Sequence, residues 1–195
     1  GVSGDSAANS HDMTDNYNSY PTLVTLGKTE YDIGGVGDGY VTKSKRYHGT
    51  GTNDYTGVNT KRTYRGHVRG VEPFYMNGST ETPVGPFTVS DLNWSGQTTA
   101  SAQFKADPTW ASVLTGDGYS VYASSTATNR GKLSETAFDD FGRPYRKSMF
   151  AIDASSGAKG NSLAVDRYYD RNGRVVASQI AYQAGAETAY DGAGR

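Results

Sequence analysis

Residues 136–143 read Thr136-Ala137-Phe138-Asp139-Asp140-Phe141-Gly142-Arg143, and their frame returns twice further along the chain. The second copy is Arg167-Tyr168-Tyr169-Asp170-Arg171-Asn172-Gly173-Arg174. The third is Thr188-Ala189-Tyr190-Asp191-Gly192-Ala193-Gly194-Arg195. All three satisfy aromatic-Asp-x-x-Gly-Arg without a gap, and internal repetition of this kind decides the architecture before any single element is assigned.

The frame is typical of a hairpin tip. Asp at the first position of a turn accepts hydrogen bonds from the turn's own backbone, and Gly three residues later takes the left-handed conformation that closes a bulged hairpin. The aromatic residue and the Arg then leave on opposite strands, where we expect the guanidinium to stack on the ring. We therefore interpret Asp139, Asp170 and Asp191 as scaffold residues rather than as acids or ligands.

Weaker copies precede the three strict ones. Tyr31-Asp32 opens the frame and then diverges, and Ser90–Gln97 keeps the spacing with Leu-Asn in place of Tyr-Asp and Gln in place of Arg. The stretch Tyr64–Arg69 is a marginal fifth candidate. The last two strict copies lie 21 residues apart and the earlier gaps are longer, which predicts inserted loops or extra hairpins.

Composition favours strands. Hydrophobic residues make up 35% of the 195, and Gly numbers 25 and Tyr 15. Aromatic side chains suit pleated surfaces and Gly suits turns, while the aliphatic content is too small for a parallel α/β core. No stretch keeps apolar residues at helical spacing over three turns. We predict an all-β fold of irregular antiparallel hairpin repeats that form a curved or spiralling sheet.

The charge balance limits the partners. Nineteen Lys and Arg stand against twenty Asp and Glu, which is unlike the one-signed footprint of a nucleic-acid binder, and no apolar run is long enough to insert into a bilayer. The chain has no Cys, so disulfides and thiolate metal sites are excluded.

The strict copies resemble the YD repeats of bacterial Rhs proteins, teneurins and the C components of insecticidal toxin complexes. Residues 31–39 look like the divergent repeats of large planctomycete-type proteins. The resemblance implies a β-spiral shell or an extracellular adhesive scaffold, and hence a secreted or cell-surface location. The family's self-cleavage motif, Asp-Pro-x-Gly-Leu, is absent, because Asp107-Pro108 continues as Thr109-Trp110.

Three regions follow from these patterns. Residues 1–21 are rich in Gly, Ser, Asn and Asp and predict an extended arm or linker. Residues 22–135 predict divergent repeats, and residues 136–195 regular ones. The final copy stops at its tip, so we expect the rest of a longer repeat chain, or a neighbouring subunit, to complete that hairpin.

Other residues are weighed as binding sites. Exposed aromatics would stack on sugars, and the candidates are Trp94, Trp110, Tyr119 and Tyr122, against a plain core role. The turns at residues 37–40 and 116–119 share Gly-Asp-Gly-Tyr but lack the run of oxygen ligands that calcium needs. The three histidines, His11, His48 and His67, have no adjacent zinc-binding partner. We expect no metal and no cofactor.

Residues 43–48 and 61–65 interleave basic and aromatic side chains, which form either a solvated sheet face or a face for an anionic polymer or glycan.

The functional expectation is a non-catalytic structural segment, a shell, fibre or scaffold unit of a larger extracellular YD-repeat protein. Two alternatives stay open: a carbohydrate-binding adhesive surface and a polysaccharide-active enzyme. The residues that define the repeat are Tyr31, Asp32, Phe138, Asp139, Gly142, Arg143, Tyr169, Asp170, Gly173, Arg174, Tyr190, Asp191, Gly194 and Arg195.

Overall fold

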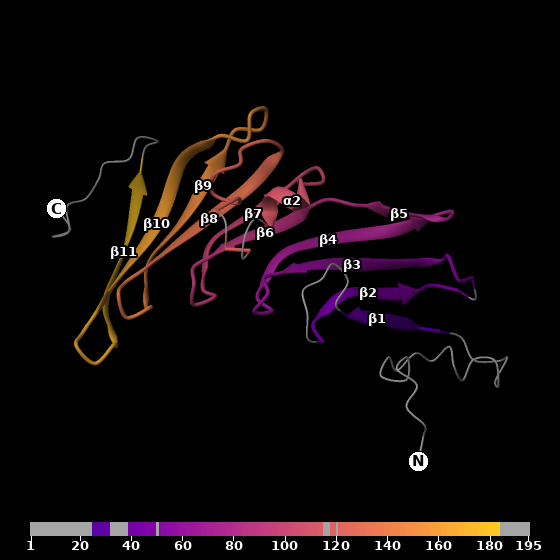
Figure 1. Cartoon of the computed structure of the whole chain (residues 1–195). Coiled ribbons are helices and arrows are strands. Elements are labelled where there is room, and N and C mark those ends of the chain that lie inside the picture. The colour runs from indigo at the N-terminus through magenta and orange to yellow at the C-terminus, as the bar shows by residue number, and fades with distance from the viewer. Residues whose placement is uncertain (1–24, 32–38, 50, 115–117, 120, 184–195) are drawn as a thin grey trace, which may run out of the picture.

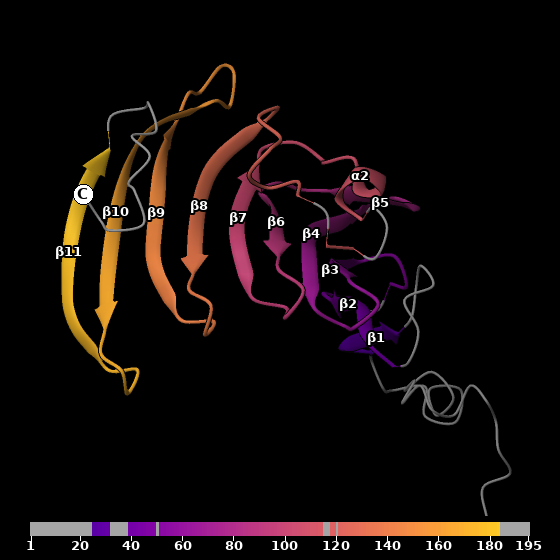
Figure 2. The same cartoon turned by 60° about the vertical axis from the view of Figure 1, so that its left-hand side comes forward.

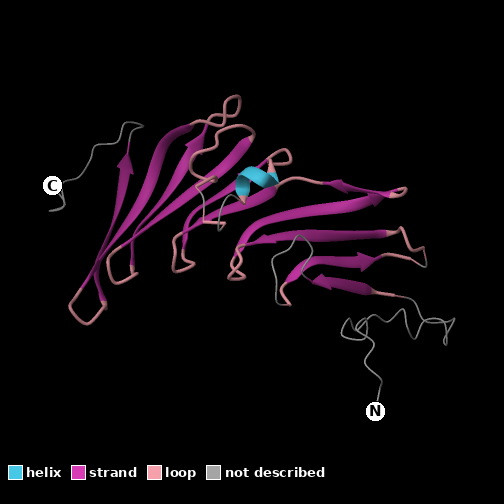
Figure 3. Ribbon diagram, viewed as in Figure 1, coloured by secondary structure: helices cyan, strands magenta, loops and turns pink. Residues whose placement is uncertain are grey.

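A computed structural model describes residues 25–31, 39–49, 51–114, 118–119 and 121–183. Within this part the chain is almost entirely strand, with one short helix (Figure 3). The strands are β1 (Gly27–Tyr31), β2 (Val41–Tyr47), β3 (Tyr55–Arg62), β4 (Val68–Asn77), β5 (Thr80–Pro83), β6 (Phe87–Leu92), β7 (Thr98–Phe104), β8 (Arg130–Phe138), β9 (Pro144–Ile152), β10 (Lys159–Tyr169) and β11 (Val175–Gln183), and the helix is α2 (Trp110–Val113).

All strands belong to one antiparallel sheet. Its order is β1-β2-β3-β4-β6-β7-β8-β9-β10-β11, and β5 pairs with β4 beside this path. The sheet is open and curved, with β1 and β11 at its two ends (Figure 1). The predicted all-β class and the curved antiparallel sheet are thus confirmed. The sheet is continuous at the expected boundary between residues 135 and 136, which falls inside β8.

Alternation of side chains puts the core on the concave face. Val89, Ala102 and Leu133 lie opposite one another on β6, β7 and β8, and all three are buried. Helix α2 lies on the inner side of the curve (Figure 2), where Val113 and Tyr122 join the same cluster. The Phe87 and Phe104 rings complete this core, which lies against β6–β8.

A buried carboxylate fixes the covering segment, residues 121–125, over the core. Asp91 on β6 accepts hydrogen bonds from the backbone N–H groups of Tyr122 (2.7 Å), Ala123 (2.8 Å) and Ser124 (2.9 Å). Arg130, also buried, donates to the carbonyl oxygens of Ala123 (3.2 Å) and Ser124 (3.1 Å). Buried charges are retained where several hydrogen bonds satisfy them. These contacts hold the segment against β6–β8.

The uneven gaps between repeats have the expected causes. Between the β3–β4 turn and the β6–β7 turn, the chain adds the short β4–β5 hairpin. Between β7 and β8 it adds α2 and the covering segment. Both insertions leave and rejoin the sheet at the edge opposite the repeat turns (Figure 1), so they lengthen the repeats without breaking the sheet.

Candidate functional site: a row of hairpin tips

Four turns of one geometry line a single edge of the sheet, which we call the tip edge (Figure 1). They join β3 to β4, β6 to β7, β8 to β9 and β10 to β11. We call them the tip row, comprising residues 63–67, 93–97, 139–143 and 170–174. In each, the fourth residue is a Gly with φ between 74° and 83°. The register shifts by one residue beside each tip, as a glycine bulge requires.

The tip at residues 139–143 shows how the turn is closed. The Gly142 N–H donates to the Asp139 carbonyl oxygen (2.8 Å), and the Asp139 N–H donates to the Arg143 carbonyl oxygen (2.9 Å). The Asp139 carboxylate accepts from the N–H groups of Phe141 (3.0 Å) and Arg143 (2.8 Å) and from the Arg143 guanidinium (2.7 Å). The expected role of Asp139 as a turn-capping residue is what this geometry shows.

The tip at residues 170–174 repeats these bonds. The Asp170 carboxylate accepts from the N–H groups of Asn172 (2.9 Å) and Arg174 (2.8 Å), and from the Arg174 guanidinium (2.7 Å). Hydrogen bonds from the Arg174 backbone and side chain lower the pKa of Asp170. Burial alone would raise the pKa of Asp139, but the hydrogen bonds from Arg143 outweigh it and the pKa falls. Both carboxylates are therefore held ionised in the turn.

The two earlier tips keep the backbone and change the side chains. Thr63 and Asn93 stand where the later tips have Asp. The Thr63 hydroxyl accepts from the His67 N–H (3.2 Å), and the Asn93 side-chain oxygen accepts from the Gln97 N–H (2.9 Å). The expected frame at Ser90–Gln97 is therefore right. The frame at Tyr64–Arg69 is wrong: the turn begins at Thr63, and Gly66 is its fourth residue, because a hydroxyl can cap a turn as a carboxylate does.

Neighbouring tips contact each other through one repeated contact, which we call the clasp. The residue that follows the glycine of one turn lies over the glycine of the next tip, and the series begins at Gly39 of the β1–β2 turn, which precedes the tip row. A Cβ built on Gly66 would lie 2.4 Å from the Tyr40 ring, one on Gly96 would lie 1.9 Å from the His67 ring, and one on Gly142 would lie 3.3 Å from Gln97 Nε2. On Gly173 it would lie 3.9 Å from the Arg143 guanidinium. Space therefore requires glycine at positions 66 and 96 and favours it at position 142, whereas at position 173 only the positive φ requires it.

Polar contacts also run from each turn to the next tip along the chain. Gln97 Nε2 donates to the Gly142 carbonyl oxygen (2.8 Å), and Arg143 Nη1 lies 3.4 Å from the Asp170 carbonyl oxygen. Tyr40 Oη lies 3.4 Å from the Arg65 carbonyl oxygen. Each tip thus contacts the following one through both packing and polar contacts.

The strand register between tips is constant. Continuing each ladder to the tip edge sets the residue after the tip glycine opposite the residue that precedes the next tip. The four pairs are Tyr40 with Arg62 from β2–β3, His67 with Leu92 from β4–β6, Gln97 with Phe138 from β7–β8, and Arg143 with Tyr169 from β9–β10. A single register rule therefore links repeats of different length.

The expected aromatic–Arg pairing needs a correction. Stacking was expected inside one hairpin, with Arg143 on Phe138. Instead the Arg143 guanidinium lies over the Tyr169 ring of the next hairpin, 4.8 Å from its centroid, and over Phe141 at 5.1 Å. The Tyr169 hydroxyl also donates to the Pro144 carbonyl oxygen (2.9 Å). The reason is the ion pair with Asp139, which directs the Arg143 side chain along the tip edge and toward the neighbouring repeat.

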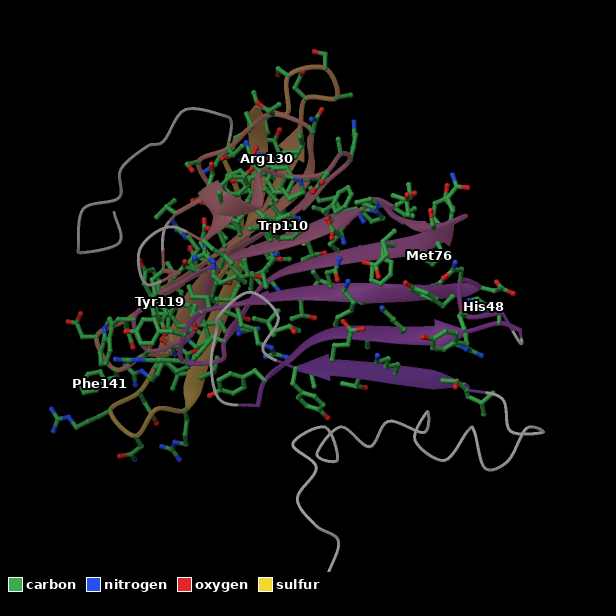
Figure 4. All side chains as sticks on the ribbon, turned by 45° about the vertical axis from the view of Figure 1, so that its right-hand side comes forward. His48, Met76, Trp110, Tyr119, Arg130 and Phe141 are labelled. Carbon is green, nitrogen blue, oxygen red and sulfur yellow. The ribbon has the colours of Figure 1, made fainter. Side chains whose placement is uncertain are left out.

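The aromatic residues proposed for sugar stacking divide by position. Trp94 lies on a tip and is 80% exposed. Trp110 and Tyr119 are half-buried and Tyr122 is buried in the core, so Tyr122 has no face free for a ligand. Phe141, which the stacking set omitted, is 83% exposed and lies at the tip edge, far from Trp110 (Figure 4). Tyr64 is a third exposed aromatic on a tip.

The basic stretch at residues 43–48 is neutralised by acids. Lys43 and Lys45 both contact Glu81, at 2.6 and 3.4 Å, and Lys45 also contacts Glu30 at 2.9 Å. Burial alone would lower the pKa of Lys45, but the interactions with Glu30 and with the Tyr55 hydroxyl outweigh it and raise the pKa. The Tyr55 hydroxyl donates to Glu81 (3.0 Å), so this face presents paired charges to any ligand.

A carboxyl pair on the concave face has no signal in the sequence. Glu72 is buried and accepts hydrogen bonds from Asn59 Nδ2 (2.6 Å) and Trp110 Nε1 (2.9 Å). Burial raises the pKa of Asp107, and the neighbouring Glu72 carboxylate raises it further. The hydrogen bond from Trp110, the first residue of α2, to Glu72 on β4 holds the segment before α2 near β4 and so brings Asp107 close to Glu72.

A polar hollow on the same face lies beside β7–β9. Its lining includes Thr99, Ser124, Glu135 and Lys159. The charges there are paired: Lys159 contacts Glu135, and Arg146 donates to both carboxylate oxygens of Asp166 at 2.6 and 2.7 Å. The hydrogen bonds from Arg146 lower the pKa of Asp166.

Several sequence-based assignments lie outside the described residues. They are Asp32, Tyr190, Asp191, Gly194 and Arg195, the arm at residues 1–21, His11, and the Asp residues of the two Gly-Asp-Gly turns. The described glycines of those turns, Gly39 and Gly118, have φ of 80° and 81°. Among the described residues, no group of three or more His, Asp or Glu side chains is arranged to hold a metal ion.

Comparison with protein-family models found no matching family, and comparison with curated proteins found no significant relative. In the described part of the chain, no helix has the length and apolar character needed to cross a membrane.

Proposed function

We propose that this chain is a non-catalytic structural segment, a shell, fibre or scaffold unit of a larger extracellular YD-repeat protein. One observation carries the proposal: the clasp recurs between all neighbouring tips in one register, across repeats of different length. A constant register lets a sheet extend by adding hairpins, because a slip of one residue would move every side chain to the wrong face.

The repeat carboxylates support the same role. Asp139 and Asp170 use both oxygens within their own turns, and the sequence frame that fixes them is explained by turn closure. Because the hydrogen bonds that lower their pKa also hold them ionised, they act as fixed caps rather than as proton carriers.

The size and location of the native protein test this function. An antibody raised against the chain should detect a species far larger than 20.8 kDa in the secreted or cell-surface fraction of the native source, and protease added to intact cells should remove it. A control antibody against a cytoplasmic protein reports whether cells stay intact. A 20.8 kDa protein confined to the cell interior would contradict the proposal.

A carbohydrate-binding surface is a second candidate, favoured by the three exposed aromatics of the tip edge. Tyr64, Trp94 and Phe141 stand on successive tips, and tips two strands apart are separated by roughly 10 Å. Aromatic faces at such intervals suit a polysaccharide chain.

The aromatic tips can be tested by substitution. On a glycan array and by titration of any polysaccharide that binds, Trp94→Ala and Phe141→Ala should each weaken binding. Ile180→Ala is the matched control, because Ile180 is 74% exposed but lies on β11 away from the tips. Equal binding by all three variants, or no binding by the unsubstituted chain, would remove this candidate.

A further inference from the structure

The convex face of β8–β11 is the face turned away from α2 (Figure 2), and it exposes large apolar side chains. On β9, the Phe150 ring packs against the core on the concave side, so the adjacent Met149 points to the convex side. The register places Met149 in one row with Leu163 of β10 and Tyr182 of β11. These three residues are 57%, 46% and 68% exposed.

A second row lies beside the first, about 7 Å away along the strands. It joins Lys147 of β9, Val165 of β10 and Ile180 of β11, and Ile180 is 74% exposed. The two rows form one contiguous surface on three neighbouring strands. We call it the outer patch, and it consists of Lys147, Met149, Leu163, Val165, Ile180 and Tyr182. An exposed apolar patch of this kind, with polar residues around it, marks a site of contact with a protein or a membrane.

Charge is sorted between the two faces of these strands. Glu135 and Asp166 are the two acids of β8–β11, and both face the concave side, where they pair with Lys159 and Arg146. The alternating positions on the convex side carry exposed bases only, namely Lys132, Lys147 and Arg167. Within the described part of the chain, none of these three bases enters an ion pair. The convex side of β8–β11 is therefore both apolar and positively charged.

This chemistry fits the surface of an anionic lipid bilayer. The unpaired bases require a negatively charged partner, and the apolar rows between them require a partner that also offers an apolar layer. In a bilayer the lipid phosphates lie directly above the acyl chains, and Lys and Arg side chains extend from the apolar level to the phosphates. The exposed Tyr145 and Tyr182 suit the headgroup level, where amphipathic rings collect. A soluble polyanion would meet the first requirement alone and would leave the apolar rows in water.

We propose that the outer patch binds peripherally to an anionic phospholipid bilayer, with Met149, Leu163 and Ile180 at the boundary of headgroups and acyl chains and with Lys147 and Arg167 on the lipid phosphates. No segment of the chain crosses the bilayer in this arrangement. The inference goes beyond the scaffold function and does not rest on it, because the convex face alone sets the contact with lipid.

Co-sedimentation of the full chain with vesicles tests the role of charge. Vesicles of phosphatidylcholine mixed with phosphatidylglycerol should carry the chain into the pellet, and vesicles of phosphatidylcholine alone should not. Lys147→Gln and Arg167→Gln should each lower the partition coefficient about fivefold, which corresponds to about 1 kcal/mol per base near an anionic surface. Arg65→Gln is the matched control, because Arg65 is an exposed base on the β3–β4 tip, five strands away from β9, and it should leave binding unchanged. Equal binding to both kinds of vesicle, or to neither, would overturn the proposal.

An apolar substitution separates a bilayer from a soluble polyanion. Ile180→Ser should weaken binding to the mixed vesicles about fivefold, because the apolar side chain no longer leaves water on binding. Val121→Ser is the matched control, since Val121 is 64% exposed but lies on the covering segment of the concave face. If the two charge variants weakened binding and Ile180→Ser did not, the partner would be a soluble polyanion such as an acidic polysaccharide, and the bilayer proposal would fail.

Cysteine labels report the contact directly, since the chain contains no Cys. Ala177 and Ser178 are neighbours on β11, both are exposed, and strand alternation points them to the concave and the convex face. A polarity-sensitive dye on Ser178→Cys should shift its emission to the blue when mixed vesicles are added, and the same dye on Ala177→Cys should not. Equal shifts at both positions would contradict the proposal. A blue emission from Ser178→Cys before vesicles are added would also contradict it, because another part of this chain or a second copy would then cover the patch.

Discussion

The tips at residues 63–67 and 93–97 share their backbone with those at residues 139–143 and 170–174, but they are closed by different side chains. In all four, the glycine N–H donates to the first carbonyl oxygen over 2.8–3.0 Å. The later pair adds an Asp–Arg ion pair within each tip, at 2.7 Å, while the earlier glycines lie beneath the rings of Tyr40 and His67. The turn and its glycine are therefore the common requirement, and the charged pair is one way of completing it.

The tightest clasp should show the largest effect. Gly96→Ala places a Cβ against the His67 ring, and Gly78→Ala, in the β4–β5 turn, is the matched control with positive φ and open space. Both variants incur the cost of a left-handed alanine, but Gly96→Ala should destabilise the protein by about 1–3 kcal/mol more, because the ring must move. Urea unfolding followed by circular dichroism measures the difference.

Two further glycine variants test whether the loss of stability follows the closeness of the contact. Gly66→Ala should resemble Gly96→Ala, because its Cβ would meet the Tyr40 ring at 2.4 Å, whereas Gly173→Ala should resemble Gly78→Ala. If all four variants lost the same stability, the clasp would contribute nothing beyond the turn, and the comparison between early and late tips would fail.

Acid should weaken the tips closed by Asp139 and Asp170 more than the uncharged tips closed by Thr63 and Asn93. The pKa values of Asp139 and Asp170 are lowered in the folded state, so their contribution to stability is complete above the ordinary value of 3.8 and is lost as the pH falls through the lower folded values. Unfolding midpoints measured from pH 6 downward should fall in this window, and they should fall less steeply in the double variant Asp139→Asn/Asp170→Asn.

Asn is the appropriate substitution because Asn93 already closes a tip by the same bond, 2.9 Å from its side-chain oxygen to the Gln97 N–H. Thr63→Ser, which changes an uncharged tip, should leave the pH profile unaltered. If the unfolding midpoint of the double variant fell with pH as steeply as that of the unsubstituted protein, the acid response would arise from other groups, such as Asp166.

The smallest effect should come from the contact between tips. Arg143→Lys keeps the charge beside Asp139 but cannot at the same time cover the Tyr169 ring and approach the Asp170 carbonyl oxygen. The expected loss is about 0.5–1 kcal/mol of unfolding free energy. Arg171→Lys, exposed in the neighbouring tip, is the control and should be neutral; equal losses would mean that the Arg143–Tyr169 contact adds no stability.

The sequence predicted features that arise from neighbouring residues. The Asp139 and Asp170 turns, the positive φ of their glycines and the strands on either side depend on local hydrogen bonds, and a short motif contains all that they need. The Thr63 tip was missed because the motif was read with its charged residues, although a hydroxyl and a glycine suffice. The antiparallel class followed from alternation and composition for the same local reason.

What the sequence alone determined is therefore the repeated unit, and what only the tertiary structure decided is how one unit meets the next. The Arg143–Tyr169 pair, the clasp of His67 on Gly96 and the approach of Asp107 to Glu72 all join residues far apart in the chain. Such contacts depend on strand register and on the curvature of the sheet, which many weak interactions set together. No spacing in the sequence encodes them, because the connections between the tips differ in length.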